Sequence, residues 1–96
     1  MNIRLDKIEK VITSEYPEIL NTSRKKEMVI TRQFLSVIMR AQDIPLTKIA
    51  SILNKKNHTT IRNYLNKHKD YVDVDEDYKM EFRSFSLNFT RKYKRY

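Results

Sequence analysis

The chain has 96 residues, a net charge of +8, no cysteine and no glycine, and 40% of its residues are hydrophobic. This length fits one domain with a modest core, the apolar share is too high for a disordered chain, and the absence of cysteine excludes disulfides and thiolate metal sites. No apolar run approaches the roughly 18 residues that span a bilayer, and the charged N-terminus is unlike a secretory signal, so we expect a cytoplasmic protein without membrane contact.

The first half of the chain is predicted to be helical, because its hydrophobic residues recur three and four positions apart. A first helix is expected over about residues 3–15, and Pro17 should end it and open a short helical turn. A long helix should follow, from an N-cap at Ser23 to about Ala41, where the segment QDIP interrupts the pattern. One face of this helix carries residues that we expect to point into the core: Met28, Thr31, Phe34, Leu35, Ile38 and Met39.

A helix-turn-helix unit is predicted at about residues 46–68. The segment NKKN connects its two helices, and Asn57 is a suitable N-cap for the second one. Ala50 is small enough to let the helices pack closely, whereas the missing glycine leaves the pattern only moderately specific. The residues expected to face the core are Leu46, Ile49, Ala50 and Leu53 in the first helix and Ile61, Tyr64 and Leu65 in the second, and His68 continues the helical spacing of this second group.

An aromatic helix is expected at about residues 75–93, where aromatic side chains follow one another in steps of four, three, four and four. Acidic residues lie near its N-terminus and basic ones near its C-terminus, as the helix dipole favours. Core packing is the most direct role for this stripe, and a surface for a protein partner is the alternative. The stripe consists of Tyr78, Phe82, Phe85, Phe89 and Tyr93. Together these elements predict a single all-α domain over residues 1–96, with about five to six helices.

Charges of one sign are grouped along the chain. Residues 44–69 contain six Lys or Arg and no acid, residues 70–77 contain five acids and no base, and residues 83–96 contain five Lys or Arg and no acid. The first of these segments coincides with the helix-turn-helix unit. This coincidence favours nucleic acid as the partner.

The residues from about Ser23 to His68 resemble the C-terminal DNA-binding domain of the bacterial replication initiator DnaA. The similarity depends on a basic segment (SRKKE), an Arg-Gln pair in the long helix, the start of the first short helix (PLTKIASIL) and the sequence NHTTI at the start of the second. The resemblance implies binding to a specific sequence of double-stranded DNA, and we expect the chain to do this as a stand-alone module. Its biological role would be replication initiation or its control, or transcription regulation.

The resemblance also implies roles for individual residues. His58 and Thr59 match positions that contact base edges in the major groove, and Thr60 matches a hydroxyl that contacts phosphate. Arg24 matches a basic residue that enters the minor groove. Positions that lie near the DNA are matched by Arg32, Gln33, Arg40, Leu46 and Thr47, and we expect phosphate contacts from Lys25, Lys26, Lys55 and Lys56.

The chain departs from the family pattern in several places. Asn57 stands where the family has aspartate, so it either caps the helix only or also contacts a base, for which adenine is the preferred partner of Asn. The family's Gly-Gly-Arg turn is NKK here, and the loop between the long helix and the helix-turn-helix unit looks one residue shorter. These changes concern the DNA sequence that is bound more than DNA binding itself. The family's Gly-rich nucleotide-binding motif is absent, so no nucleotide cofactor is expected.

Other kinds of site find little support in the sequence. Two histidines ten residues apart, without cysteine, do not form a zinc site, and no carboxylate pair or Ser/His/Asp arrangement indicates catalysis. We therefore expect no metal, no cofactor and no enzyme activity. Two alternatives to duplex DNA remain. One is an adaptor or decoy that binds a replication protein through the C-terminal helix, and the other is binding of structured RNA, whose narrow major groove excludes a recognition helix.

Overall fold

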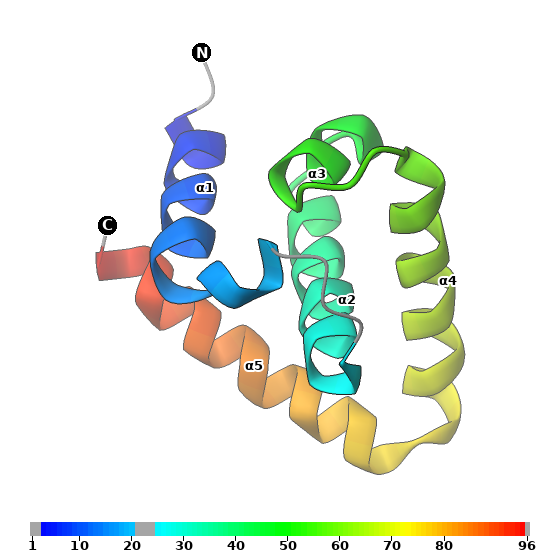
Figure 1. The fold of residues 1–96 in the computed structure, drawn as a ribbon. Coiled ribbons are helices and arrows are strands. Elements are labelled where there is room, and N and C mark those ends of the chain that lie inside the picture. The colour runs from blue at the N-terminus through cyan, green and yellow to red at the C-terminus, as the bar shows by residue number, and fades with distance from the viewer. Residues whose placement is uncertain (1–2, 21–24, 96) are drawn as a thin grey trace.

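The computed structural model describes residues 3–20 and 25–95, and these residues form helices without any strand. The predicted all-α class is therefore confirmed. In chain order the elements are α1 (Ile3–Glu15), the 3-10 helix η1 (Pro17–Leu20), α2 (Lys26–Ala41), α3 (Leu46–Ile52), α4 (His58–Val74) and α5 (Glu76–Arg95). Figure 1 shows α2 in the middle of the fold, with α1 on one side, α4 on the other and α5 crossing below.

Helix α2 is the central element, because it contacts η1, α3, α4 and α5. A helix surrounded by several others buries a wide arc rather than a narrow stripe. The buried residues of α2 are Arg32, Gln33, Phe34, Leu35, Ser36 and Met39. Around it lies a core that takes buried apolar residues from all five α-helices and η1 in the described part of the chain, among them Ile8, Ile19, Leu35, Ile49, Ile61 and Phe89.

Two helices end with a residue in the left-handed conformation that is not glycine. Asp43 follows α2 with φ of 62°, and Asn54 follows α3 with φ of 58°. After α3, the Asn54 N–H donates to the Ser51 carbonyl at 3.1 Å and the Lys55 N–H donates to the Ala50 carbonyl at 2.7 Å. This pair of bonds is a Schellman motif. Asn tolerates the left-handed region better than most residues, which explains how a chain without glycine makes the turn of its helix-turn-helix.

The helix boundaries follow the sequence closely except at α4. Helices α1, η1 and α3 agree with the predictions, and α2 ends at Ala41 as expected. The predicted N-cap Ser23 lies outside the described residues, and the N-cap position of α2 is occupied by Lys25, without a side-chain cap. Helix α4 was expected to end near His68, and this prediction is wrong, because the helix continues to Val74.

The extension of α4 has a packing cause. The ring of Tyr71 lies 5.3 Å from that of Tyr78 in α5, and Val72 is half-buried, so the acidic segment after His68 has apolar side chains that hold it as a helix. The connector between α4 and α5 is the single residue Asp75, whose carboxylate accepts the Tyr78 N–H at 3.1 Å. Asp75 thereby caps the N-terminus of α5, where a negative charge is favourable.

The aromatic stripe of α5 packs inward, as its main interpretation predicted. Tyr78 and Phe89 are buried, and the other three rings are half-buried. Phe34 of α2 lies between 5.2 and 5.3 Å from the rings of Tyr78, Phe82 and Phe85. Within residues 3–20 and 25–95, no helix is long and apolar enough to cross a membrane.

Candidate nucleic-acid interface

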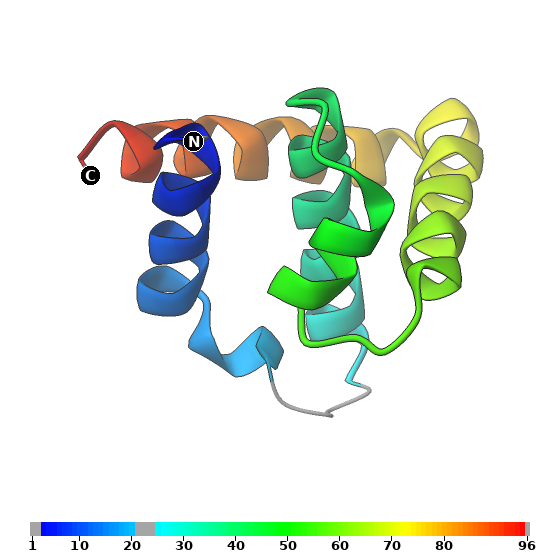
Figure 2. The same cartoon turned by 90° about the horizontal axis from the view of Figure 1, so that it is seen from above.

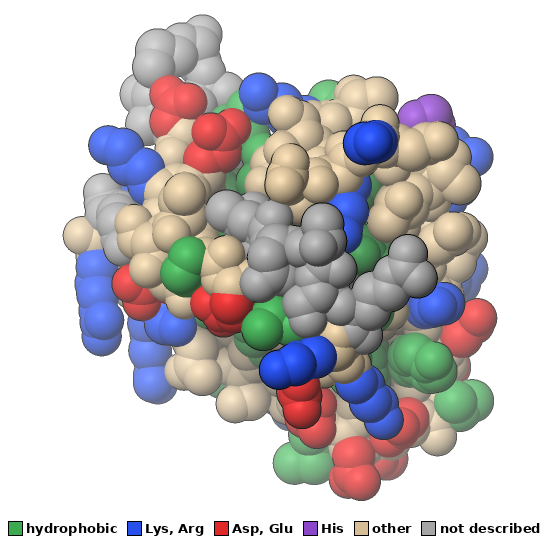
Figure 3. Space-filling model, in the orientation of Figure 1, with side chains coloured by type: hydrophobic (Ala, Val, Ile, Leu, Met, Phe, Trp, Pro, Cys, Tyr) green, Lys and Arg blue, Asp and Glu red, His purple; other side chains and the backbone are tan. Residues whose placement is uncertain are grey.

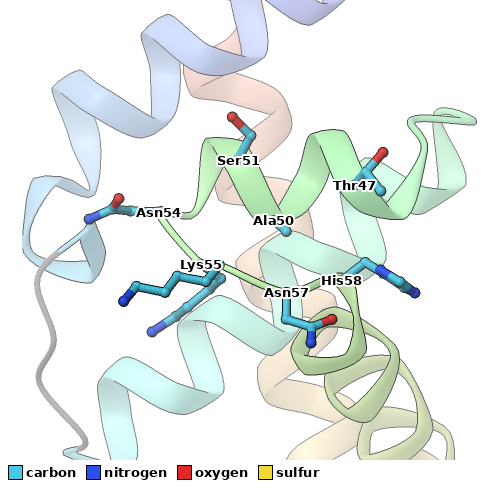
Figure 4. Close-up of a pocket in the computed structure, with 8 residues that line it drawn as sticks. Thr47, Ala50, Ser51, Asn54, Lys55, Asn57 and His58 are labelled. Atoms are coloured by element: carbon cyan, nitrogen blue, oxygen red, sulfur yellow. The ribbon is translucent and has the colours of Figure 1, made fainter.

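Helices α3 and α4 and their connection enclose a polar hollow on the surface of the molecule, shown in Figure 4. Its volume is about 370 Å³. Its lining contains small, polar and basic side chains and no acid among the described residues: Thr47, Ala50, Ser51, Asn54, Lys55, Lys56, Asn57 and His58. The hollow thus brings together five of the residues that the sequence predicted to lie at the DNA, and the cap residue Asn57 is one of them.

Asn57 caps α4 with its side chain. Its Oδ1 accepts the Thr59 N–H at 2.8 Å, and its backbone carbonyl accepts the Thr60 N–H at 3.2 Å. The predicted N-cap is therefore confirmed. Asn57 is also exposed, so the amide nitrogen of its side chain remains accessible to a ligand while the oxygen holds the cap. Contact of this residue with a base stays a prediction.

The first turn of α4 presents polar side chains outward while apolar ones hold the helix from behind. His58 and Thr59 are exposed and Thr60 is half-buried. On the opposite side, Ile61 is fully buried, and Tyr64 and Leu65 pack half-buried against the core. Ala50 is 3% exposed, which agrees with its predicted role of allowing close packing of α3 on α4. The direction of this first turn is thus fixed by the core.

The exposed face of α4 continues beyond the residues that the sequence singled out. Arg62, Asn63 and Asn66 are exposed and lie three, four and seven positions after Thr59. Residues at these spacings share one face of a helix. This regular spacing from Thr59 was the signal in the sequence that could have identified them.

The N-terminus of α2 lies on the same side of the molecule as the turn between α3 and α4. Figure 2 shows this side as the edge opposite α5, whereas in Figure 1 the turn lies at the top of the molecule and the start of α2 well below it. Lys25 and Lys26, at the start of α2, are exposed there. Arg24, the residue matched to a minor-groove contact, lies outside the described residues. Two of the three predicted basic residues of this segment therefore lie on the same side of the molecule as Lys55 and Lys56, away from α5, but the two pairs are separated along that side.

Two of the predicted DNA-proximal residues lie in the interior, and for them the prediction is wrong. Arg32 is 1% exposed and its Nε donates to the carbonyl of Ile19 at 2.8 Å, which ties α2 to η1. Gln33 is 2% exposed and its Nε2 donates to the hydroxyl of Tyr78 at 3.2 Å. Because α2 is surrounded by other helices, this part of it offers no surface to DNA.

The remaining predicted positions are divided between surface and core. Thr47 is exposed and lines the hollow, whereas Leu46 is half-buried against the core. Arg40 is exposed, but it lies at the C-terminal end of α2, about 21 Å along the helix from Lys26 at 1.5 Å per residue. Its Nη1 donates to the carbonyl of Ile44 at 3.2 Å. Arg40 thus supports the connection to α3 and is separate from the basic residues at the start of α2.

The opposite end of α4 has a different chemistry. The Tyr78 hydroxyl lies 2.8 Å from Nδ1 of His68 and accepts from Gln33, and these three side chains form a partly buried polar cluster. Burial lowers the pKa of His68, and burial also raises the pKa of Tyr78.

The surface around the C-terminal end of α4 is acidic. Figure 3 shows acidic side chains gathered at the lower right, over the junction of α4 and α5, whereas α3 carries mainly uncharged and basic ones. The exposed acids of this junction are Asp70, Asp73, Asp75, Glu76, Asp77 and Glu81.

Comparisons with known proteins found no match to the chain. No family model matches the sequence, and neither the curated proteins nor the solved structures include one that is significantly similar. In the described part of the chain, no group of three or more His, Cys, Asp or Glu side chains is arranged to hold a metal ion.

Proposed function

We propose that the chain is a sequence-specific double-stranded DNA-binding module that places the first turn of α4 in the major groove. The observation that carries this proposal is the exposure of Asn57, His58 and Thr59 at a helix N-terminus whose surroundings contain no acid among the described lining residues. Side chains at the N-terminal end of a recognition helix contact base edges. A Thr methyl group or an imidazole edge suits such contacts.

The basic residues near this turn support the same function. Lys55 and Lys56 lie beside the first turn of α4, and Lys25 and Lys26 lie on the same side of the molecule, away from α5. Phosphate contacts fix the position of a protein on the duplex and supply most of the affinity that does not depend on sequence. The acidic junction of α4 and α5 would repel phosphate, so the charge distribution favours one orientation on DNA.

The similarity of the NHTTI and PLTKIASIL segments to DnaA suggests the biological role. We propose a role in replication initiation or its control, or in transcription regulation. With no matching family model, this part of the proposal depends on the motif residues and on their exposure at the candidate interface.

The proposal is tested by the salt dependence of duplex binding. Binding should weaken by about 0.9 log units per log unit of salt for each phosphate neutralised. In the variant Lys55→Ala/Lys56→Ala this slope should become flatter, and affinity should fall to a similar degree for all duplexes. A matched control, Lys79→Ala/Arg95→Ala, removes two exposed charges from α5 on the opposite edge and should keep most of the affinity.

Two outcomes would favour the alternatives. Equal losses in both charge variants would indicate nonspecific attraction of a basic chain, and competition by duplex RNA as effective as that by duplex DNA would favour structured RNA. The adaptor alternative would require the outer face of α5, because the aromatic stripe of this helix is packed inward. A replication protein that binds independently of salt and of Lys55 and Lys56 would support it.

A further inference from the structure

Helix α5 has one face without a partner in this structure. Its aromatic stripe packs on the core, and Figure 2 shows the helix along the edge of the molecule opposite the α3–α4 turn. On the outer face, Met80 is 67% exposed and Leu87 is 58% exposed. These two residues are seven positions apart, which is two helical turns or about 10.5 Å along the helix. They form an apolar pair on one line of the helix surface.

The charges on the same line are arranged symmetrically about this pair. Glu76 lies four residues before Met80, and Arg91 lies four residues after Leu87, and both are exposed. Acids occupy the first turn of α5 and bases its last turn. If two such helices pack antiparallel, the acidic end of each meets the basic end of the other. Parallel packing would instead place like charges together.

We propose that the outer face of α5 pairs antiparallel with the same face of a second copy of this chain. In this register Met80 of one copy lies against Leu87 of the other, and Glu76 of one copy lies beside Arg91 of the other. The pattern is that of an isologous twofold interface, in which every contact occurs twice. The proposal is independent of the proposed DNA binding.

The surface next to Leu87 offers space for the second copy. A groove of about 390 Å³ lies between the end of α4 and α5, and Val72, Phe82 and Leu87 provide apolar parts of its lining. Met80 of the second copy lies opposite Leu87 in the proposed register and therefore at the edge of this groove. A methionine adapts well to an irregular apolar groove because its side chain is flexible.

The size of this surface and one like-charge contact predict a weak association. The face is one helix wide, which is small for a stable interface. Near the twofold axis, Arg83 of each copy lies beside Ser84 of the other, so the two Arg83 side chains repel. We therefore expect a monomer–dimer equilibrium that depends on concentration. Because α5 lies opposite the α3–α4 turn, pairing leaves the candidate DNA interface of each copy accessible, facing away from the other.

The test uses two charge-reversal variants. Neither should form a dimer alone, but the two should form a dimer with each other when they are mixed. In a dimer of the Glu76→Lys variant, both contacts between positions 76 and 91 would join two bases. In a dimer of the Arg91→Glu variant, both contacts would join two acids. By sedimentation equilibrium, the wild type should rise from the mass of one chain toward twice that mass with concentration, and each variant alone should remain a monomer. In a mixture, every pair joins a base to an acid, so the two variants should form a heterodimer.

The controls separate this contact from general charge attraction and from loss of folding. Lys10→Glu and Glu18→Lys make the same charge changes at exposed positions outside α5, and each should associate alone as the wild type does. Leu87→Glu, which changes an exposed residue and should keep the helical circular-dichroism signal, should abolish association. A wild type that stays monomeric at every concentration would overturn the proposal. So would a mixture of folded Glu76→Lys and Arg91→Glu that fails to associate, or association that persists in Leu87→Glu.

Discussion

The two ends of α4 use polar residues in opposite ways. At the N-terminal end, His58 and Thr59 are exposed, and His58 lines a hollow without acidic lining among the described residues. At the C-terminal end, His68 is half-buried, lies 2.8 Å from the Tyr78 hydroxyl and packs with its ring centroid 4.5 Å from that of Phe82. Histidine thus contributes to packing at the C-terminal end of the helix, as His68, and is exposed to solvent at the N-terminal end, as His58.

This difference shows how structure separates folding residues from binding residues. A buried polar group must form its hydrogen bonds inside the protein, and its loss is therefore measured as stability. An exposed polar group on a face held rigidly from behind contributes little to stability, and its loss is measured as affinity. If the comparison is correct, substitutions at the two ends of α4 should affect different measurements.

The largest expected effect comes from the residue that holds α4 on the core. Ile61 is 0% exposed and lies one turn after the exposed residues of the candidate interface. Ile61→Ala should lower the free energy of unfolding by about 2–5 kcal/mol, because it removes buried methyl groups and leaves a cavity. Urea denaturation measures this loss. Thr59→Ala, a matched change at an exposed position, should stay within roughly 0.5 kcal/mol of the wild type, and a comparable loss there would contradict the comparison.

The next effect concerns the polar cluster at the C-terminal end. Tyr78→Phe removes the hydroxyl that joins Gln33 and His68 and leaves both without this partner. We expect a loss of about 1–3 kcal/mol, the usual cost of an unsatisfied buried polar group. Thermal or urea unfolding monitored by circular dichroism gives the value. The same change at the more exposed Tyr71 provides the control, and equal effects of the two substitutions would mean that the cluster contributes no stability.

The cap of α4 should give a smaller effect with a clear chemical signature. Asn57→Ala removes the acceptor for the Thr59 N–H and should cost about 1 kcal/mol, whereas Asn57→Asp keeps an acceptor and should leave stability nearly unchanged. Any change of the preferred base in Asn57→Asp would then report a contact with DNA rather than a loss of folding. Duplex selection with the two proteins measures this preference, in which adenine should give way toward cytosine at one position.

The smallest expected effect is a dependence of stability on pH. Burial lowers the pKa of His68 from its ordinary value of 6.5 in the folded chain. The unfolded chain therefore binds the proton at higher pH than the folded chain, so this contribution is complete above about pH 6.5 and is lost as the pH falls through the folded pKa. Unfolding free energies measured between neutral and mildly acidic pH should show this decrease. In His68→Gln that part of the decrease should be absent, and an unchanged profile would contradict the burial of a neutral histidine.

Much of the fold could be predicted because local and tertiary signals agree. Helix α2 and the two helices of the helix-turn-helix unit carry apolar residues at helical spacing, and QDIP and NKKN interrupt the pattern between them. Asn57 was identified as a cap because its residue type suits that position and the apolar pattern resumes after it. The extension of α4 was missed because its acidic residues resemble a connector, while the packing of Tyr71 on Tyr78 depends on two different helices.

The exposed residues of the candidate site could be predicted where their exposure follows from their place in a single helix. The prediction failed where packing against other helices decides whether a residue is exposed. The first turn of α4 is exposed because the next residues on its apolar face hold the helix on the core. Arg32 and Gln33 look like surface residues in the sequence, but α2 is surrounded by neighbours that bury both. The hydrogen-bond partners that make this burial possible, the carbonyl of Ile19 and the hydroxyl of Tyr78, lie 13 and 45 positions away in the sequence.

The central claim is that the first turn of α4 contacts base edges, and a complete binding profile tests it most directly. Preferred duplexes are selected from random sequence with the wild type, and binding is then measured with all four bases at each position for His58→Ala and Thr59→Ala. Both variants should remain folded and lose about 1–3 kcal/mol of discrimination at one or two adjacent positions, with little change on random DNA. Folded variants whose profiles equal that of the wild type would contradict the assignment of α4 as a recognition helix.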